Sequence, residues 1–352
     1  MYPKVEINLN GIIKNAHLMK EICKERNKSY CLITKVLSDN KEVVKALVDS
    51  GVDCIGESRI KTLISYKDIN AEKWLIRIPM LCEVEDVVTY SDVSLNSELV
   101  TLKALNEAAL KQNKIHKVIL MYELGDLREG CSKEELEEII PEILTLSNIK
   151  IYGLGTNLSC YGATIPTEEN MKELVDVAEE LERKFNIKFE IISGGNSSSY
   201  KMLKNGELPY RINNLRLGES VFLGNVPCFE EPILEFSRNN FMLKTQIIEL
   251  KEKASVPRGK HYVDSFGHIP TFVDRGVRKK AIIGLGKQDT TLGGIMIEDE
   301  NIVTLGGSSD HIILDVTDSG KAYKVGDIIA FKLNYSGVLN LMTSKYVERE
   351  II

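Results

Sequence analysis

One lysine stands at a position where it could do covalent chemistry. The run Tyr30 to Lys35 (YCLITK) predicts a short buried strand that ends on this lysine. Burial favours a neutral amine, and a neutral amine can attack a carbonyl group. A solvated lysine at the start of a loop would give the same pattern, and position alone favours that alternative.

Two polar segments could hold a phosphate group. Residues 194–199 (GGNSSS) and residues 216–219 (RLGE) each follow an apolar run. Glycine lets the backbone approach closely, while serine hydroxyls and the free N–H groups of a helix start donate to phosphate oxygens. A loop that only supplies a serine cap to the following helix would give the same sequence pattern. Combined with Lys35, however, such a cradle is what pyridoxal 5'-phosphate requires.

The elements that must position these residues alternate between strand and helix patterns. Strand-like runs lie at residues 30–35, 52–57, 73–79, 92–97, 116–124, 149–158, 188–195 and 213–220. Helical patterns cover residues 11–26, 40–50, 98–112, 133–146 and 168–185. This α/β order is typical of a (β/α)8 barrel, whose active site lies at the C-terminal ends of the strands. A doubly wound open sheet is the rival architecture.

The last third of the chain has a different pattern of predicted secondary structure. From about Glu230 the long helical patterns give way to β runs separated by Gly, Asp and Asn turns. We therefore predict a barrel over residues 1–228 and a mainly β domain over residues 229–352. Residues 5–10 (VEINLN) are expected to pair with the later sheet.

Composition narrows the class of protein. The 352 residues carry 45 Lys and Arg against 51 Asp and Glu, a net charge of −6, which argues against a nucleic-acid partner. No apolar run approaches the roughly 18 residues that a membrane span needs, and the N-terminus has no signal-peptide core. The seven cysteines are scattered without a C-x-x-C pair, which favours a reducing cytoplasm and no metal site.

Several short segments, taken in order, resemble the alanine racemase family of pyridoxal-phosphate enzymes. The matching segments are Lys35, the E-L-G-D-L-R-E-G run at 123–130, Asn196-Ser197, Arg216-Leu217-Gly218, the D-H-I-I-L-D-V-T run at 310–317, and Tyr335. The resemblance covers nearly the whole chain. It implies an N-terminal barrel followed by a β domain, a small amino-acid substrate, and a homodimer in which each site is shared between subunits.

The resemblance also implies roles for individual residues. The cofactor would be bound by Lys35, Asn157, Asn196, Ser197, Arg216, Gly218, Glu219 and Tyr335. Arg216 would face the pyridine nitrogen, and Glu219 would contribute its backbone N–H rather than its carboxylate. The substrate would contact Arg128, Asp289 and Ser309. The catalytic groups would be Lys35 on one face of the substrate, with His311 and Asp310 as candidates for the other face.

Departures from the family pattern point to a branch of it. Leu285 stands where the family has its catalytic tyrosine, Met121 replaces an often carbamylated lysine, and Asn157 replaces a histidine near the cofactor ring. The segments GVDCIGESRI, SGGNSSSYK, RLGES and LGKQD are similar to the ornithine-racemising branch. Without the tyrosine, the second acid/base stays open among Asp289, Asp310 and His311. A carboxylate that binds the ornithine side chain is sought at Asp289 or Asp310.

Three other functions compete with ornithine racemisation. The first is racemisation of alanine or of many amino acids, against which the missing tyrosine counts. The second is a non-catalytic pyridoxal-phosphate homeostasis protein, which shares a strand-end lysine and a motif like Gly56-Glu57-Ser58 but lacks the β domain. The third is a decarboxylase or lyase on the same fold, since a fold does not fix a reaction.

Overall fold

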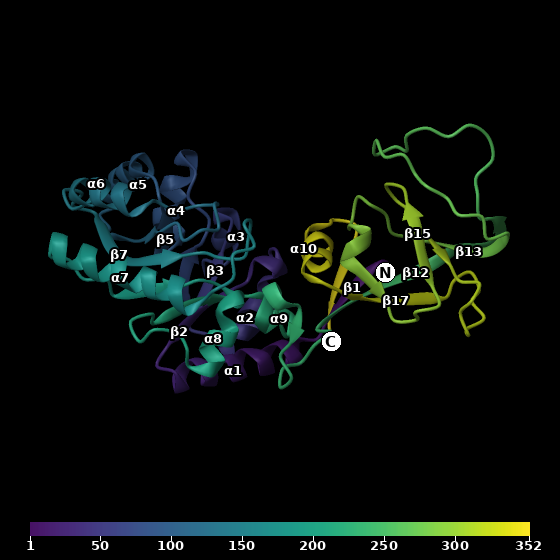
Figure 1. The fold of residues 1–352 in the computed structure, drawn as a ribbon, viewed down its shortest axis with the longest axis horizontal. Helices are drawn as coiled ribbons and strands as arrows, with labels where there is room; N and C mark the ends of the chain where they lie inside the picture. The colour runs from purple at the N-terminus through teal and green to yellow at the C-terminus, as the bar shows by residue number, and fades with distance from the viewer. The chain divides into compact units, whose positions relative to one another are not determined.

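The computed structural model describes all residues from Met1 to Ile352, and these form two compact units. The barrel unit comprises Asn10–Arg238, and the β unit combines Met1–Leu9 with Asn239–Ile352. Figure 1 shows the helices of the barrel unit around its strands, and the strands of the β unit as a separate group.

The barrel unit extends past the predicted boundary at residue 228. The segment after it stays with the barrel because Ser237 and Asn15 exchange hydrogen bonds. Asn15 Nδ2 donates to Ser237 O at 2.8 Å, and Ser237 N donates to Asn15 Oδ1 at 2.7 Å. Such non-local hydrogen bonds are not visible in the local sequence pattern.

Eight parallel strands close into a barrel, which confirms the predicted fold class. The strands are β2 (Ser29–Ile33), β3 (Cys54–Glu57), β4 (Glu72–Leu75), β5 (Val93–Asn96), β6 (His116–Met121), β7 (Ile149–Thr156), β8 (Ile191–Gly194) and β9 (Asn214–Leu217). The first and last of them pair in register from Ser29↔Asn214 to Leu32↔Leu217, so the sheet has no open edge.

Nine helices belong to the barrel unit or lead into it, and capping side chains mark the start of α2, α6 and α7. They are α1 (Leu9–Glu25), α2 (Lys41–Asp49), α3 (Ile60–Ser65), α4 (Val84–Tyr90), α5 (Leu99–Lys111), α6 (Lys133–Ile143), α7 (Glu168–Phe185), α8 (Tyr200–Asn205) and α9 (Glu219–Leu223). The Asn40 side chain accepts from Val43 N at the start of α2, as its position predicts. Thr167 and Asn170 form a capping box that starts α7 at the predicted residue.

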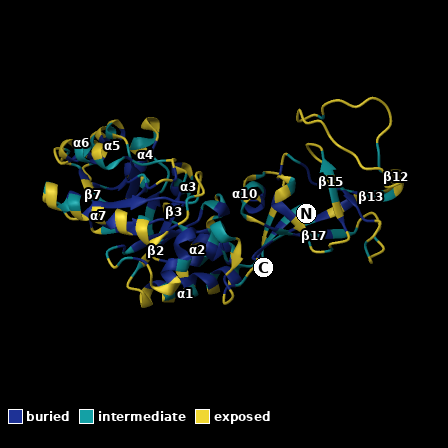
Figure 2. Cartoon of the chain, viewed as in Figure 1, coloured by how far each residue is buried: buried dark blue, intermediate teal, exposed yellow.

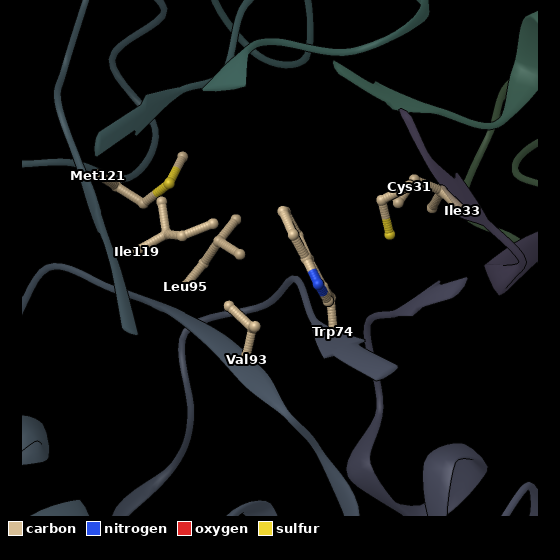
Figure 3. Close-up of a cluster of buried hydrophobic side chains, with 7 residues drawn as sticks. All are labelled: Cys31, Ile33, Trp74, Val93, Leu95, Ile119 and Met121. Atoms are coloured by element: carbon tan, nitrogen blue, oxygen red, sulfur yellow. The ribbon is translucent and has the colours of Figure 1, made fainter. Parts of the chain in front are cut away.

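The barrel interior holds a packed apolar core. Figure 3 shows this cluster, in which Trp74 of β4 lies among side chains from β2, β5 and β6. The cluster comprises Cys31, Ile33, Trp74, Val93, Leu95, Ile119 and Met121. Met121, which stands where the family has a lysine, is fully buried here. The interior is therefore filled by side chains and is not a pore.

Buried polar residues gather where the strands end. Figure 2 shows the strands of the barrel unit buried and the outer helix faces exposed. Buried polar groups at or just after C-terminal strand ends are Thr34, Glu57, Asn96, Thr156, Asn157, Ser197 and Arg216. Burial of polar groups is costly unless they are hydrogen-bonded, so their concentration at one end marks that end as the functional one.

The β unit is one mainly antiparallel sheet. Its path runs β14 (Ile295–Ile297), β17 (Ile328–Leu333), β12 (Phe241–Ala254), β13 (Val277–Ile283), β16 (Ile312–Asp315), β15 (Val303–Gly307). The N-terminal strand β1 (Lys4–Ile7) pairs with β12 and with β18 (Glu348–Ile351). The sequence analysis missed β18 and the nine-residue helix α10 (Tyr335–Thr343), whose short patterns are weak signals.

No helix in the structure is both long enough and apolar enough to cross a membrane.

Candidate active site

Lys35 lies at the mouth of the barrel, just after the observed strand rather than at its last residue as predicted. The strand β2 ends at Ile33, and Lys35 begins a short 3-10 turn, Lys35–Leu37. The turn is held because Thr34 N donates to Gly56 O at 2.9 Å, which ties this segment to the end of β3. Lys35 is half-buried. Functional residues of such barrels lie at the C-terminal ends of the strands, and Lys35 lies next to one of these ends.

A buried carboxyl group, which the sequence analysis named only as part of the Gly56-Glu57-Ser58 motif and gave no role, lies beside the Lys35 turn. Glu57 is 1% exposed, and its Oε1 accepts from Thr34 Oγ1 at 2.6 Å. Burial raises the pKa of Glu57 to about 8, against the opposing effects of this hydrogen bond and of the Lys35 charge. The only signal in the sequence was a charged residue at the end of an apolar strand run.

Backbone N–H groups converge on one serine hydroxyl in the predicted phosphate cradle. Ser197 Oγ accepts from Gly218 N and from Ser220 N, each at 3.1 Å, and lies 3.1 Å from Ser220 Oγ. The loops after β8 and β9 therefore meet, as predicted from the two polar segments. Ser198 Oγ nearby is buried and has no hydrogen-bond partner. Converging donors and an unpartnered hydroxyl suit an anion such as phosphate.

Gly218 permits the close approach of these loops. A Cβ atom at this position would lie 3.0 Å from Ile33 O and 3.1 Å from Ile33 Cβ, both in β2. A larger residue would push the start of α9 away from β2. Gly195 contributes in another way, because its φ of +97° lies in the region that favours glycine.

Arg216 is the central cation of the barrel mouth. It is 4% exposed, Nη1 donates to Ser193 Oγ at 2.7 Å, and Nη2 donates to Thr156 O at 2.6 Å. Burial lowers the pKa of Arg216, but an arginine starts so far above neutral pH that it stays charged. Its hydrogen bonds go to neutral oxygens rather than to a carboxylate. The guanidinium is therefore fixed in direction and available to a polar ligand.

Three further predicted residues lie together between the loops after β6, β7 and β8. Asn196 Nδ2 donates to Asn157 Oδ1 at 3.1 Å, and the Asn157 amide also lies next to the Arg128 guanidinium. Asn196 Nδ2 also donates to Leu158 O at 2.7 Å. Arg128 forms a two-point ion pair with Glu129, rather than pairing with Glu123 or Asp126. This cluster presents one guanidinium and two amides at the mouth.

The Glu219 carboxylate is held away from the cradle. Its Oε1 accepts from Asn225 Nδ2 at 3.3 Å, and burial raises its pKa, while the Lys35 charge lowers it. The backbone of Glu219 begins α9, next to the donors of Gly218 and Ser220.

The β unit contains a second polar cluster. The segments 286–289 and 308–311 lie side by side, because Lys287 N donates to Ser308 O and Gln288 N donates to Ser309 O. His311 Nδ1 lies 3.0 Å from Asp310 Oδ1. Hydrogen bonds from Ser309, His311 and Ser308 lower the pKa of Asp310, so it is a carboxylate near neutral pH. A histidine oriented by a carboxylate can act as an acid or a base.

Two further predicted residues, and the position of the family's tyrosine, lie elsewhere in the β unit. Asp289 is 4% exposed, and its oxygens accept from Ser344 Oγ at 2.7 Å and from Gly286 N at 3.4 Å. These bonds favour a turn-holding role over contact with a substrate. Tyr335 is the half-buried first residue of α10. Leu285, at the position of the family's tyrosine, is buried.

These arrangements define an enzyme that works at the C-terminal end of a (β/α)8 barrel. The family model described as alanine racemase, N-terminal domain, matches residues 7–226. The ornithine racemase of Acetoanaerobium sticklandii is 49% identical over 353 residues, which cover 100% of both chains. The lysine racemase of Thermotoga maritima is 39% identical over 351 residues, covering 99% of this chain and 98% of that protein.

Similarity to solved structures agrees with these matches. The alanine racemase of Bartonella henselae, solved with covalently bound pyridoxal phosphate, superposes with a TM-score of 0.74 at 16% identity, covering 99% of both chains. The chain belongs to the alanine racemase family. The predicted family and the predicted racemase class are thereby confirmed.

Replacing Gly218 by alanine tests the cradle. We expect Gly218→Ala to weaken binding of pyridoxal 5'-phosphate by the apo-protein by about tenfold or more, since overpacking typically costs about 1–3 kcal/mol. Gly320→Ala is the matched control, because a Cβ there meets nothing within 4 Å. Isothermal titration calorimetry of both variants measures the dissociation constants. Unchanged affinity in Gly218→Ala would contradict the assignment of the cradle.

Proposed function

We propose that the protein is a pyridoxal-phosphate-dependent racemase that interconverts L-ornithine and D-ornithine. The observation that carries the proposal is the convergence of Lys35, Arg216 and the Ser197–Gly218 cradle at one end of the barrel. The full-length similarity to an ornithine racemase supports the substrate. The complete β unit favours a racemase over a homeostasis protein that lacks this domain.

The residues at the mouth fit the cofactor. Ser197, Gly218 and Asn196 would hold its phosphate, Arg216 would donate to its pyridine nitrogen, Lys35 would bind it covalently, and Asn157, Glu219 and Tyr335 complete the proposed set. The bound cofactor withdraws electrons from the substrate Cα and so acidifies the Cα–H bond. Arginine has only donors, so the pyridine nitrogen would remain an unprotonated acceptor. This moderates the electron withdrawal and favours proton return to Cα over side reactions.

Racemisation needs proton transfer on both faces of the Cα atom. We assign one face to the Lys35 amine and the other to His311, which Asp310 orients from 3.0 Å. One group removes the Cα proton while the other supplies a proton to the opposite face, so the numbers of atoms and charges balance. Arg128, with Ser309, would bind the substrate. Asp289 is left out of this assignment, because both its oxygens are occupied within the fold.

Each active site is proposed to form at a homodimer interface. Lys35 lies in the barrel unit and His311 lies in the β unit. In the proposed dimer, the β unit of one subunit supplies His311 to the barrel mouth of the other.

All seven cysteines are free thiols. Free thiols are typical of a reducing compartment, which supports a cytoplasmic setting.

Substrate preference is tested with purified holoenzyme and a chiral amino-acid panel. We expect kcat/KM for ornithine to exceed that for lysine by about tenfold or more, because one methylene in a fitted pocket changes specificity by about 10–200-fold. Alanine, which cannot use a site for a cationic side chain, is expected to be poorer still. A higher kcat/KM for alanine would overturn the proposed substrate, and a higher value for lysine would reassign it.

Hybrid dimers test the shared site. Lys35→Ala and His311→Ala chains are each expected to be inactive alone. After unfolding and refolding together, hybrid dimers keep one complete site, so about a quarter of wild-type activity should return. Mixed Lys35→Ala and wild-type chains provide the control for refolding yield. A mixture that stays inactive although the hybrids form would contradict the shared site.

A further inference from the structure

The loop after β6 carries two oppositely charged neighbours, and the proposed mechanism gives the acidic one no role. Arg128 Nη2 donates to Glu129 Oε1 at 2.6 Å, and Arg128 Nε donates to Glu129 Oε2. The Glu129 side chain is 17% exposed and that of Arg128 is 43% exposed. A partly exposed ion pair of this kind adds little to stability, which leaves both charges available for a ligand.

The backbone holds this ion pair in place. Glu123 N donates to Cys131 O at 3.0 Å, which closes the loop after β6 on itself. Gly130 permits the closure, because a Cβ atom there would lie 2.6 Å from Glu123 N. The ion pair therefore belongs to a closed loop at the C-terminal end of a barrel strand, where the active sites of such barrels form.

The ion pair lies beside the proposed cofactor site. Arg216 Nη2 donates to Thr156 O at 2.6 Å, and the amide of the next residue, Asn157, lies next to the Arg128 guanidinium. Burial lowers the pKa of Arg216, and the charges of the pair also act on it, with Glu129 raising this pKa and Arg128 lowering it. A substrate held at the cofactor would therefore lie near both charges.

Glu129 differs from the other two acidic residues of this loop. Glu123 Oε1 accepts from two backbone N–H groups of its own loop, each at 2.9 Å. Asp126 is 1% exposed, and its carboxylate accepts from the N–H groups of residues 160–162 at 3.1 to 3.2 Å. Glu129 pairs instead with a side chain, and each of its oxygens has a lone pair for a second donor.

We propose that the Arg128–Glu129 pair selects ornithine, with Glu129 binding the ammonium group at the end of the substrate side chain. Arg128 binds the substrate carboxylate. Ornithine carries a negative charge at the first place and a positive charge at the second, so the pair is complementary to it. The proposal rests on the proposed function, which names ornithine as the substrate, and it makes Glu129 a specificity-determining residue.

The pairing with Arg128 suits Glu129 to this role. A half-buried carboxylate without a partner would lose hydration at a cost, and Arg128 supplies that partner before the substrate arrives. The ornithine ammonium then adds a charge-assisted hydrogen bond. Norvaline has the same carbon chain without the terminal ammonium, so it would cover the carboxylate and give it no new donor. The site therefore discriminates against an uncharged side chain.

Glu129→Gln tests the charge, because it keeps the shape of the side chain and one acceptor for Arg128. Glu182→Gln is the matched control. Glu182 also forms a two-point ion pair with an arginine, Arg211, and its side chain is likewise 17% exposed. It accepts from Phe189 N, just before β8 begins, so it lies at the opposite end of the barrel from the active site.

The first measurement is kcat/KM for ornithine and for norvaline with each holoenzyme. We expect Glu129→Gln to lower kcat/KM for ornithine by about tenfold to a hundredfold, the loss that follows removal of a charge-assisted hydrogen bond. The change should lie mainly in KM, because the ammonium is remote from the reacting Cα atom. The value for norvaline should stay the same or rise. Glu182→Gln should change neither value.

The second measurement uses Glu129→Asp, which keeps the charge and withdraws it by one methylene. The longer side chain of lysine then reaches the carboxylate better than that of ornithine. We expect the ratio of kcat/KM for lysine to that for ornithine to rise by about tenfold, the usual effect of one methylene in a fitted pocket. This variant keeps the test decisive if Glu129→Gln folds poorly.

The outcomes separate this inference from the proposed function. Equal losses for ornithine and norvaline in Glu129→Gln would mean that Glu129 only positions Arg128, and would overturn the inference alone. An unchanged kcat/KM for ornithine in that variant, or an unchanged lysine-to-ornithine ratio in Glu129→Asp, would do the same. A wild-type enzyme that racemises norvaline as well as ornithine would overturn the proposed substrate, and the inference with it.

Discussion

The pairing of β2 with β9 is the constraint on which the rest of the barrel site depends. These strands are the first and the last of the barrel, and their register brings Leu32 beside Leu217. The residues that follow each strand must then lie next to one another. Gly218 consequently packs against Ile33, and the cradle forms beside the turn that holds Lys35. Residues nearly 200 positions apart become one site because the sheet closes.

The barrel has two parts that differ in polarity: an apolar interior and a mouth that holds buried charged groups. The interior contains the apolar cluster around Trp74. Above it, Arg216 is buried with hydrogen bonds to neutral oxygens, and Glu57 is buried beside Lys35. Charged groups in such surroundings interact more strongly than in water, since the local dielectric is low. The same burial that raises the pKa of Glu57 makes its ionisation sensitive to the charge of Lys35.

Local patterns in the sequence were sufficient to predict the barrel. Eight apolar runs predicted the eight strands, and Asn40 and Thr167 mark where two helices begin. The β runs predicted after Glu230 are likewise found as strands, β12 to β17. These features depend on residues close together in the chain. The short strand β18 was missed because its order depends on pairing with β1, at the other end of the sequence.

The candidate site was predictable only in part, for the same reason. Glycine and serine types pointed to the cradle, but the contact of Ser197 Oγ with two backbone N–H groups depends on barrel closure. The hydrogen bond from Ser344 Oγ to Asp289 Oδ1 joins residues 55 positions apart, so the sequence alone could not show it. Glu57 was named only within a motif and given no role, because its raised pKa results from burial, which one sequence does not display.

The central claim is that Lys35 is the residue that binds pyridoxal 5'-phosphate covalently. Borohydride reduction of the holoenzyme followed by peptide mapping tests it most directly. The account predicts a stable pyridoxyl label on the peptide that contains Lys35, with loss of the visible band. A label on another lysine, or a protein that takes no label after incubation with the cofactor, would contradict it.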